Sequence, residues 1–379
     1  MKLFDVYPLY DITPERAKDV YVYDQQGIEY LDLYGGHAVI SIGHGHPTYV
    51  EKINHQLHQI GFYSNAVHNP LQQQLAETIA KHSCCHEYQM FMCSSGAEAN
   101  ENALKLASFH TNKARVIAFT NAFHGRTSAA VAATDNPTIN APLNKQQTVT
   151  FLPFNDEKAL ETELQKGDVC AVIFEAIQGV GGLDEPSESF VYALDRLCKA
   201  HKVCLIADEV QAGFSRTGTF FAYQKYLIEP HIITMAKGMG NGFPVGGILV
   251  HQSIKAKHGM LGTTFGGNHL ACSASLAVLD VLEKEDLQQH AKTLGTYFIE
   301  KAQAVPQIKR IKGRGLMLGL EFNFEVGALR KSLIYDHQIF TGGSSNKKVL
   351  RILPPLTVQQ KHIDYFFKQL EEALNHLAL

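Results

Sequence analysis

Two residues in the second half of the chain, Lys237 and Asp208, each end an apolar run. Lys237 follows Ile-Ile-Thr-Met-Ala, and Asp208 follows Val-Cys-Leu-Ile-Ala. Such runs are typical of parallel strands that are buried on both faces, and ligands bind at the carboxyl edge of such sheets. A buried lysine amine there can bond to an aldehyde, while a carboxylate keeps a pyridine nitrogen protonated so that the ring accepts electrons. Together the two residues predict a site for pyridoxal 5'-phosphate (PLP).

A phosphate site is indicated by Met-Cys-Ser-Ser-Gly-Ala-Glu-Ala-Asn, which runs from a strand into a helix. Gly96 stands where backbone amides would have to approach an anion closely. The free N–H groups and the partial positive charge of a helix N-terminus favour a phosphate. The alternative is a capping box, Ser95-x-x-Glu98, that only starts a helix. Both interpretations can hold at once.

The faces of the pyridine ring also need partners. Asn-Ala-Phe-His-Gly-Arg-Thr follows an apolar run at 115–119 and places Phe123 at its carboxyl end. Phe123 is a candidate to stack on one face of the ring, and Val210, two residues after Asp208, is a candidate for the other. Gln211 is a candidate to hydrogen-bond the phenolic oxygen of the ring. For Phe123 alone, packing in the core is the competing interpretation.

Two arginines are candidate anchors for a substrate carboxylate. Arg126 lies in the same loop as Phe123, and Arg351 lies in Leu-Arg-Ile-Leu-Pro-Pro-Leu. A guanidinium beside apolar residues is costly to bury without an anionic partner, and its planar fork suits bidentate binding of a carboxylate. A solvated surface position is the alternative for either one.

The elements that must position these residues follow from the sequence pattern. From about residue 89 onward, short β-rich runs alternate with helical stretches, which predicts a mostly parallel α/β sheet with helices on both faces. The expected strands are Gln89–Cys93, Arg115–Phe119, Thr148–Pro153, Val169–Glu175, Val203–Asp208, Ile232–Met235 and Gly246–Val250. Residues 187–201 have helical spacing.

The two ends of the chain have a different pattern. Residues 20–33 alternate around an Asp-Gln-Gln-Gly turn and predict a β-hairpin. A long helix is expected from Asn268 to about residue 284, followed by an α+β tail in which 314–322 is a strand. We therefore expect an arm at 1–45 that joins a small domain, a large domain at 46–265, and a linker helix with the C-terminal small domain at 266–379.

Composition excludes several classes of protein. The 379 residues carry 34 Lys and Arg against 37 Asp and Glu, a net charge of −3, so no basic surface for nucleic acid is expected. The apolar runs are far shorter than the roughly 20 residues that span a bilayer, and the N-terminus lacks a signal-peptide pattern, which predicts a cytoplasmic protein. The 7 cysteines lack paired spacing and favour buried thiols. The His44-x-His46 pair has no third ligand at a metal-site spacing, so no metal is expected.

Taken together, these motifs resemble the class III (subgroup III) PLP-dependent aminotransferases of fold type I, and among them the acylornithine aminotransferases. The resemblance covers nearly the whole chain and rests on Gly43-His-Gly-His-Pro, Ser-Gly-Ala-Glu-Ala-Asn, Phe-His-Gly-Arg-Thr, Glu175-Ala-Ile-Gln-Gly, Asp-Glu-Val-Gln, Ala-Lys-Gly, Thr-Thr-Phe-Gly-Gly-Asn and Arg-Gly-Leu-Met-Leu-Gly.

The resemblance implies roles for particular residues. Lys237 would be the lysine that bonds the cofactor, and Asp208 the partner of the pyridine nitrogen. The other cofactor-binding residues would be Ser95, Gly96, Ala97, Phe123, Val210, Gln211 and Thr264, and the substrate-binding residues Arg126, Arg351 and Glu175. Thr264 would reach the cofactor phosphate of a neighbouring subunit, which implies a homodimer.

Three positions depart from the family pattern. Ala97 replaces a usual threonine, which removes one side-chain donor to the phosphate. Val180 replaces a usual glutamate, which in relatives pairs with the arginine that corresponds to Arg351. His37 stands where ornithine δ-aminotransferases carry a tyrosine.

The function that the resemblance implies is transfer of the δ-amino group of an N-acylornithine, acetylated or succinylated, to 2-oxoglutarate in arginine biosynthesis. Transaminases of free ornithine, 4-aminobutyrate or the ε-amine of lysine are the nearest alternatives. A glutamate-1-semialdehyde aminomutase is disfavoured because Arg126 retains a carboxylate anchor. A non-catalytic PLP-binding regulator is the alternative outside enzymes, and it would need a DNA-binding module that the sequence does not contain.

Overall fold

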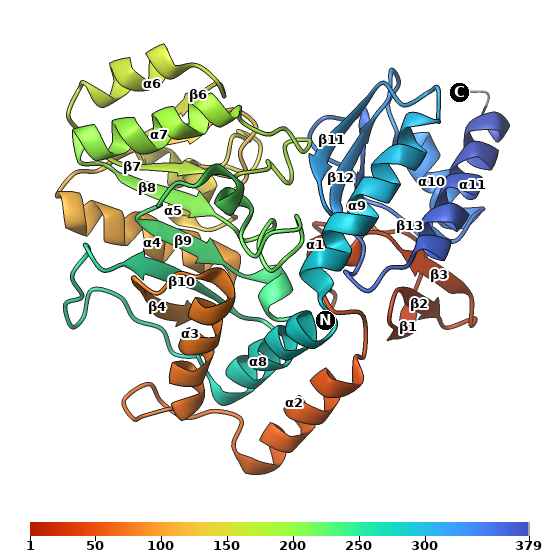
Figure 1. Cartoon of the computed structure of the whole chain (residues 1–379), viewed down its shortest axis with the longest axis horizontal. Coiled ribbons are helices and arrows are strands. Elements are labelled where there is room, and N and C mark those ends of the chain that lie inside the picture. Colours follow the sequence, from red (N-terminus) through yellow and green to blue (C-terminus); the bar gives the residue numbers. More distant parts are fainter. Residues whose placement is uncertain (378–379) are drawn as a thin grey trace.

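The chain folds into two lobes, as seen in a computed structural model that describes residues 1–377 (Figure 1). The larger lobe is built around a seven-stranded sheet. The smaller lobe combines the C-terminal third of the chain with strands from its N-terminus (Figure 1). The arrangement brings the carboxyl edge of the large sheet to face the smaller lobe.

The large sheet contains the seven predicted strands. Their bounds are β4 Tyr88–Cys93, β5 Arg115–Phe119, β6 Val149–Leu152, β7 Val169–Phe174, β8 Cys204–Asp208, β9 Ile232–Met235 and β10 Gly246–His251. They are arranged in the order β4-β10-β9-β8-β7-β5-β6. β10 pairs antiparallel with β4 and β9, and the other neighbours are parallel. The prediction of a mostly parallel sheet is therefore confirmed.

Helices cover both faces of this sheet. In the large lobe they are α2 Pro47–Gln59, α3 Pro70–Ser83, α4 Gly96–Thr111, α5 Ser128–Ala132, α6 Glu157–Leu164, α7 Glu188–His201 and α8 His269–Lys284, with short 3₁₀ turns at Asn144–Gln146, Ala222–Tyr226 and Lys237–Met239. α4 packs across β7 to β10 with α5 beside it, while α7 packs on β8 from the opposite face (Figure 1). α2 and α3 pack on α8.

Local sequence explains where two of the predicted helices begin. The Ser187 side chain accepts a hydrogen bond from the N–H of Phe190 at 3.3 Å and starts α7. The Asn268 side chain accepts one from Ala271 at 2.9 Å and starts α8. Both residues are favoured at this capping position because their oxygens satisfy N–H groups that have no intrahelical partner.

The smaller lobe contains two sheets. β11 Arg310–Arg314, β12 Met317–Glu321 and β14 Val349–Ile352 form an antiparallel sheet, next to α9 Leu287–Gln303, α10 Gly327–Tyr335 and α11 Gln360–His376. β1 Pro14–Lys18, the predicted hairpin β2 Tyr21–Asp24 and β3 Glu29–Asp32, and β13 Ile339–Phe340 form the other. β13 pairs with β3 in parallel, so the N-terminal strands and the C-terminal third share one sheet.

One predicted strand is wrong in its extent. The apolar run 314–322 belongs to two strands, because Arg314 ends β11 and Met317 begins β12. Gly315 makes the turn between them with φ +57°. Its Cα also lies so close to the backbone of Thr217 that an added Cβ would come within 2.5 Å of it. The close backbone contact requires glycine here.

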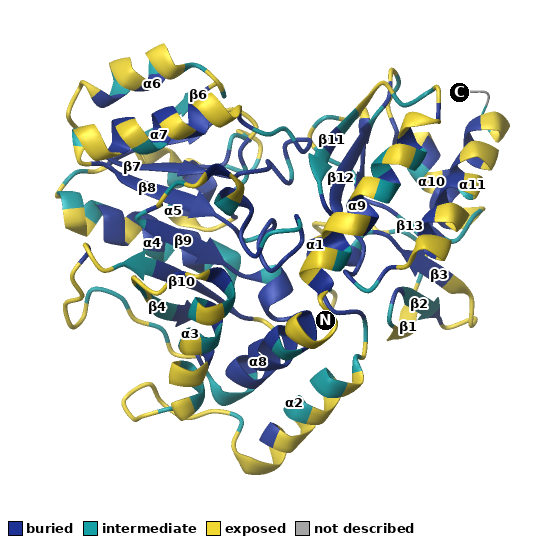
Figure 2. Ribbon diagram, in the orientation of Figure 1, coloured by how far each residue is buried: buried dark blue, intermediate teal, exposed yellow. Residues whose placement is uncertain are grey.

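The core runs through the large sheet and continues into the smaller lobe (Figure 2). All six residues of β7 and all five of β8 are buried, as expected for strands covered on both faces. The buried guanidinium of Arg216 links the lobes, because its Nη1 donates to the carbonyl oxygens of Leu316 at 3.0 Å and Pro354 at 2.6 Å. Burial lowers the pKa of Arg216 to about 10.

A left-handed turn, α1 Gly35–Ala38, connects β3 to the large lobe. All four residues have positive φ, including +68° at His37 and +63° at Ala38. Residues other than glycine adopt this conformation at a cost. Ser41 then ties the segment to the large lobe by donating through Oγ to the carbonyl of Gly238 at 2.7 Å.

Candidate active site

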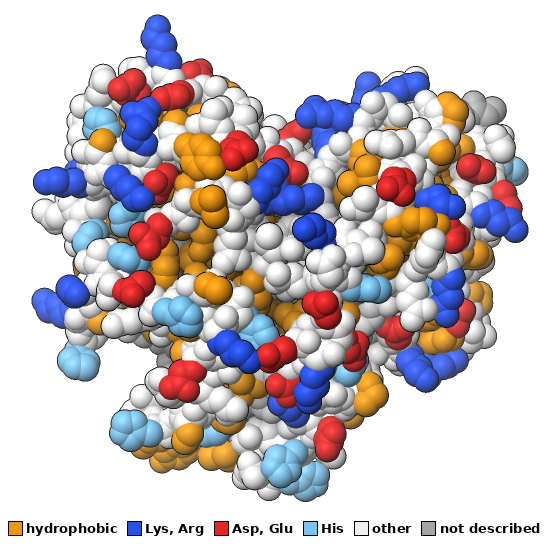
Figure 3. All heavy atoms as spheres, in the orientation of Figure 1, with side chains coloured by type: hydrophobic (Ala, Val, Ile, Leu, Met, Phe, Trp, Pro, Cys, Tyr) orange, Lys and Arg blue, Asp and Glu red, His pale blue; other side chains and the backbone are white. Residues whose placement is uncertain are grey.

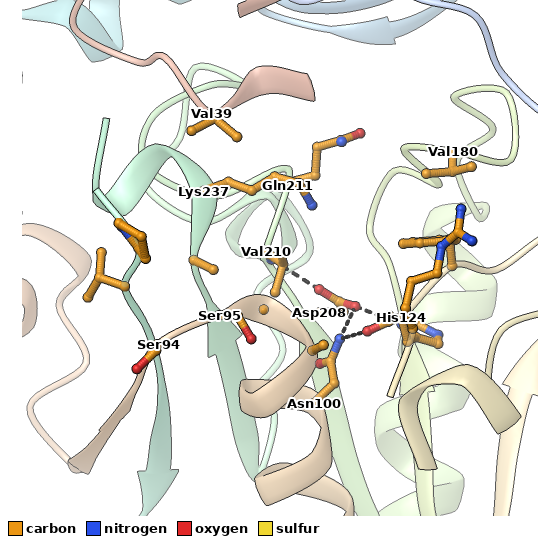
Figure 4. Close-up of a pocket in the computed structure, with 18 of the residues that line it drawn as sticks. Val39, Ser94, Ser95, Asn100, His124, Val180, Asp208, Val210, Gln211 and Lys237 are labelled. Carbon is orange, nitrogen blue, oxygen red and sulfur yellow. Dashed lines mark hydrogen bonds and ion pairs between the residues drawn. The ribbon is translucent and has the colours of Figure 1, made fainter. Parts of the chain in front are cut away.

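A cavity of about 360 Å³ lies at the carboxyl edge of the large sheet. Its walls come from the N-terminus of α4, the loops that follow β5, β7, β8 and β9, and Val39 of the segment between the lobes (Figure 4). On the surface, a notch separates the two lobes (Figure 3). Most of the predicted site residues line this cavity, and the exceptions are Arg351 and Thr264.

Lys237 lies two residues after the end of β9 and lines the cavity (Figure 4). The residue is half-buried rather than fully buried, because part of its side chain faces the open cavity. It has a left-handed conformation, with φ +47°. Desolvation lowers the pKa of Lys237, and the charges of Asp208 and Glu175 oppose that shift. A lysine with a lowered pKa is the kind of amine that acts as a nucleophile and as a proton carrier.

Asp208 ends β8 and is held by four donors. Its Oδ1 accepts from the Val210 N–H at 3.0 Å and from Thr234 Oγ1 at 3.4 Å. Its Oδ2 accepts from Asn100 Nδ2 at 2.8 Å and pairs with His124 Nδ1 at 2.7 Å (Figure 4). Burial on its own would raise the pKa of Asp208, but the hydrogen bond and charge of His124 outweigh it and lower the pKa. The carboxylate is therefore kept ionised in a buried position.

His124 and Asn100 were not among the predicted site residues. Asn100 lies one turn into α4 and donates to both Asp208 Oδ2 and the carbonyl of His124, the latter at 2.7 Å. His124 is buried, and although desolvation lowers its pKa, the bond to Asp208 raises it overall. A signal for Asn100 was present in the sequence, because it follows Gly96 by four residues and so shares its face of the helix.

The N-terminus of α4 has capping contacts and also faces the cavity. Ser95 Oγ accepts the N–H of Glu98 at 3.2 Å, and Glu98 Oε2 accepts the N–H of Ser94 at 2.7 Å, so a capping arrangement is present. Ser95, Gly96 and Ala97 also line the cavity. The first N–H groups of a helix have no intrahelical partner, which leaves this end able to bind an anion.

Gly96 is required by packing. A Cβ added there would lie 2.5 Å from Cγ1 of Val210, so only glycine lets Val210 approach the helix end. Val210 and Phe123 both line the cavity, as expected for residues that face a ring. Gln211 lines it too, but its side chain lies between Arg351 Nη1, at 3.5 Å, and the carbonyl of His37, at 3.2 Å.

The two predicted arginines lie in different environments. Arg126 is exposed at the cavity edge, 6.0 Å from the Phe123 ring centre, and has no hydrogen-bond or ion-pair partner among residues 1–377. Arg351 is only 4% exposed and does not line the cavity. Burial lowers the pKa of Arg351.

Four neutral oxygens surround the Arg351 guanidinium in the described part of the chain. The shorter hydrogen bonds go to the carbonyls of Gly343, at 2.5 Å, and Gly179, at 2.7 Å. The longer contacts are to Gln211 Oε1, at 3.5 Å, and Tyr34 Oη, at 3.4 Å. The cation is thus held by its neighbours without being neutralised by a bonded carboxylate.

Glu175 and Thr264 complete the predicted set, and Val180 is the position where the usual glutamate is replaced. Glu175 lines the cavity, but its two oxygens accept the backbone N–H groups of Phe123, at 3.0 Å, and Gly179, at 2.9 Å. Val180 lines the cavity as an apolar residue. Thr264 is exposed and lies outside the cavity of its own chain.

The donor set of this cavity fits PLP. A helix N-terminus faces the cavity where a phosphate needs N–H donors, and Gly96 lets Val210 approach that end. Phe123 and Val210 add apolar surface to the cavity wall, Asp208 is kept ionised, and Lys237 has a lowered pKa. Among residues 1–377, no cluster of His, Cys, Asp or Glu side chains has the arrangement of a metal site.

Comparison with known proteins agrees with this chemistry. Residues 5–374 match the family model for class-III aminotransferases. The chain is 40% identical to the acetylornithine aminotransferase of Bacillus subtilis (strain 168), covering 99% of this chain and 98% of the relative. It is also 40% identical to that of Aquifex aeolicus (strain VF5), covering 95% and 96%.

Solved structures give the same result for the fold. The ornithine aminotransferase from Toxoplasma gondii ME49 superposes with a TM-score of 0.91 at 27% identity, covering 98% of this chain and 92% of that one. An S-selective transaminase from Arthrobacter sp. shares the fold with a TM-score of 0.91, at 24% identity, covering 100% and 96%. The predicted fold type I architecture, the PLP cofactor and the transaminase class are confirmed. The chain belongs to the class-III aminotransferases, a family of PLP-dependent enzymes.

Proposed function

We propose that this aminotransferase transfers the δ-amino group of an N-acylornithine to 2-oxoglutarate, as a step of arginine biosynthesis. The observation that carries the proposal is 40% identity, over nearly the full length of both chains, to proteins named acetylornithine aminotransferase. The acyl group is acetyl or succinyl.

Lys237 acts at the reacting carbon. Bound PLP supplies an aldehyde that exchanges amines and a protonated ring that accepts electrons. Lys237 Nζ would take the proton from the amine-bearing carbon of the donor as general base and deliver it, as general acid, to the former aldehyde carbon of the cofactor. Its lowered pKa suits both tasks, since such a catalyst works best near the ambient pH.

The remaining cofactor residues bind and orient. Asp208 holds a positive charge on the ring nitrogen, and His124 and Asn100 fix its orientation. Phe123 and Val210 would pack on the two faces of the ring. The α4 N-terminus, with Ser95, Gly96 and Ala97, would bind the phosphate, and Gln211 would hydrogen-bond the phenolic oxygen.

Two arginines bind the substrate carboxylates in this proposal. Arg126 is an exposed cation at the cavity edge without a hydrogen-bond or ion-pair partner among residues 1–377. Arg351 contacts Gln211, which lines the cavity. It binds the acceptor carboxylate in place of its long contacts to Gln211 and Tyr34. The other proposed substrate-binding residue is Glu175.

We also propose a homodimer in which Thr264 completes the phosphate site of the partner subunit. In its support, Thr264 lies next to an exposed apolar patch, where the rings of Phe62 and Phe265 are 5.4 Å apart. Sedimentation velocity should give twice the chain mass. Mixed dimers of Lys237→Ala and Thr264→Ala chains should contain one complete site with wild-type affinity for the cofactor. A monomer, or mixed dimers without such a site, would contradict this.

The domain limits proposed are 1–45, 46–265 and 266–379. Pairing of β3 with β13 supports assigning the N-terminal arm to the small domain. We propose that the protein is located in the cytoplasm. A reducing compartment fits its six buried free thiols, Cys85, Cys93, Cys170, Cys198, Cys204 and Cys272. No helix in the described range 1–377 is long and apolar enough to cross a bilayer.

A donor panel tests the proposed function. Purified protein is assayed with 2-oxoglutarate and acetylornithine, succinylornithine, ornithine, 4-aminobutyrate or lysine as the donor. The acylornithines should give the highest kcat/KM. The main rival donor is free ornithine, because the fold is also similar to that of an ornithine aminotransferase. A higher kcat/KM for ornithine than for both acylornithines would overturn the proposal.

A further inference from the structure

Glu175 is a buried carboxylate that has no bonded cation among residues 1–377. It is only 6% exposed, and its two oxygens accept the N–H groups of Phe123 and Gly179. Burial raises the pKa of Glu175 to about 7. Each Glu175 oxygen already accepts a backbone amide, so the carboxylate ties two loops at the cavity together, and its position needs an explanation beyond a contact with substrate.

The two amides come from loops that follow neighbouring parallel strands. Phe123 is in the loop after β5, Gly179 is in the loop after β7, and the two strands pair. A second tie runs between the same loops, because Gln178 Nε2 donates to the carbonyl of Thr120 at 2.8 Å. The loops approach so closely that a Cβ on Gly181 would lie 2.6 Å from the carbonyl oxygen of Asn121.

Gly179 connects the two tied loops to Arg351. Its N–H is bonded to Glu175, and its carbonyl accepts Arg351 Nη1 at 2.7 Å. Gly343 accepts Arg351 Nε from the same guanidinium. These two carbonyls fix the guanidinium through Nε and Nη1. Its remaining contacts, from Nη1 to Gln211 and from Nη2 to Tyr34, are long enough to be exchanged for a carboxylate.

We propose that Glu175 is a positioning residue: by accepting both backbone amides it fixes the Phe123 loop against the Gly179 loop, and so orients Arg351 for the acceptor carboxylate. This inference rests on the proposed function, in which Arg351 binds that carboxylate. In this inference Glu175 does not contact the substrate itself but acts on Arg351 through Gly179.

The protonation state of Glu175 decides whether its carboxyl group can bond both the Phe123 loop and the Gly179 loop. An ionised carboxylate accepts from both amides, whereas a protonated one turns a hydroxyl towards one of them and loses that bond. The charged groups that face it are His124 in the β5 loop, Asp208 at the end of β8, Lys237 after β9 and Arg351 in β14. The hydrogen bonds that fix the two loops to Glu175 should therefore weaken as pH falls through about 7.

The test compares Glu175→Gln with a matched control, Glu209→Gln. Glu209 is also buried, also accepts two backbone amides, from Ala222 and Tyr223 at 2.8 Å each, and also has its pKa raised by burial to about 7. Glu209 lies outside the cavity lining. The probe is glutarate, an unreactive dicarboxylate, titrated into the cofactor-loaded protein from pH 5.5 to pH 8.5.

For wild type and Glu209→Gln, the Kd of glutarate should rise as pH falls through about 7. In Glu175→Gln the Kd at pH 8.5 should be about tenfold higher, as expected for one lost hydrogen bond, with a flatter dependence on pH. Hydrogen exchange at Gly179 or Phe123, corrected for pH, should also be about tenfold faster in that variant. Wild-type exchange at both amides, or a wild-type Kd, would overturn the positioning role.

Thermal unfolding gives an independent readout. The pKa of Glu175 is raised on folding, so its contribution to stability is present at low pH and is lost as pH rises through about 7. The Tm of Glu175→Gln should therefore rise relative to wild type between pH 5.5 and pH 8.5, while its affinity for glutarate stays lower. If no acylornithine is a donor but these binding and exchange differences remain, the donor assignment fails and the positioning role stands.

Discussion

Replacement of Lys237 by alanine should abolish repeated turnover while leaving the fold intact. The amine that exchanges with the donor and the group that moves its proton are the same side chain, so both functions are lost together. We expect a loss in kcat of about 10⁴-fold or more, since general base catalysis alone contributes up to that factor. Position 237 has a left-handed φ of +47°, which costs alanine about as much as lysine because both carry a Cβ, so the Tm should change little.

The same variant provides its own control. PLP should still bind through the phosphate and ring contacts, and a small amine added to the solution should restore part of the proton transfer. Circular dichroism checks that the fold is unchanged. Wild-type turnover without added amine would remove Lys237 from the mechanism.

Replacement of Asp208 by asparagine should keep the shape of the site and lose its charge. An amide cannot stabilise a protonated ring nitrogen, so kcat should fall by about a thousandfold, or roughly 4 kcal/mol of transition-state stabilisation. The amide nitrogen would also face one of the present donors, His124, Asn100, Val210 or Thr234, at a cost of about 1–3 kcal/mol in folding free energy. Steady-state kinetics and thermal unfolding measure the two effects.

The adjacent Glu209 is the matched control for Asp208. Glu209→Gln also neutralises a buried carboxylate that accepts backbone amides, but outside the cavity. It should therefore lower stability without a comparable loss of kcat. If Asp208→Asn stayed within a factor of two of wild type, or if Glu209→Gln lost as much activity, Asp208 would not be the partner of the ring nitrogen.

The strands and the site residues at their ends could be predicted because both depend on local sequence. Apolar runs identified the seven strands to within two residues, and parallel strands bring the residues at their carboxyl ends to one edge of the sheet. Lys237, Asp208 and Phe123 therefore line one cavity, as expected from their positions alone. The capping residues Ser187 and Asn268 were equally local signals.

Other features depend on contacts between distant segments. The support of Asp208 by His124 and Asn100 joins residues 84 and 108 positions away in sequence. Arg351 lies behind Gly179, 172 positions away, so no local pattern predicted that it would be outside the cavity lining. The turn at Gly315 was missed because the apolar residues from Leu316 onward were joined to Arg314 in one expected strand, while the close approach of Gly315 to the backbone of Thr217 involves a distant segment.

The most direct test of the central claim is to locate the cofactor on the chain. The cofactor-loaded protein is treated with borohydride, which makes the lysine–cofactor bond permanent, and is then digested and analysed by mass spectrometry. The added mass should lie on Lys237 at one equivalent per chain, and prior addition of N-acetylornithine should prevent the labelling. Labelling of another lysine, or labelling that N-acetylornithine leaves unchanged, would contradict a PLP aminotransferase that acts on this donor through Lys237.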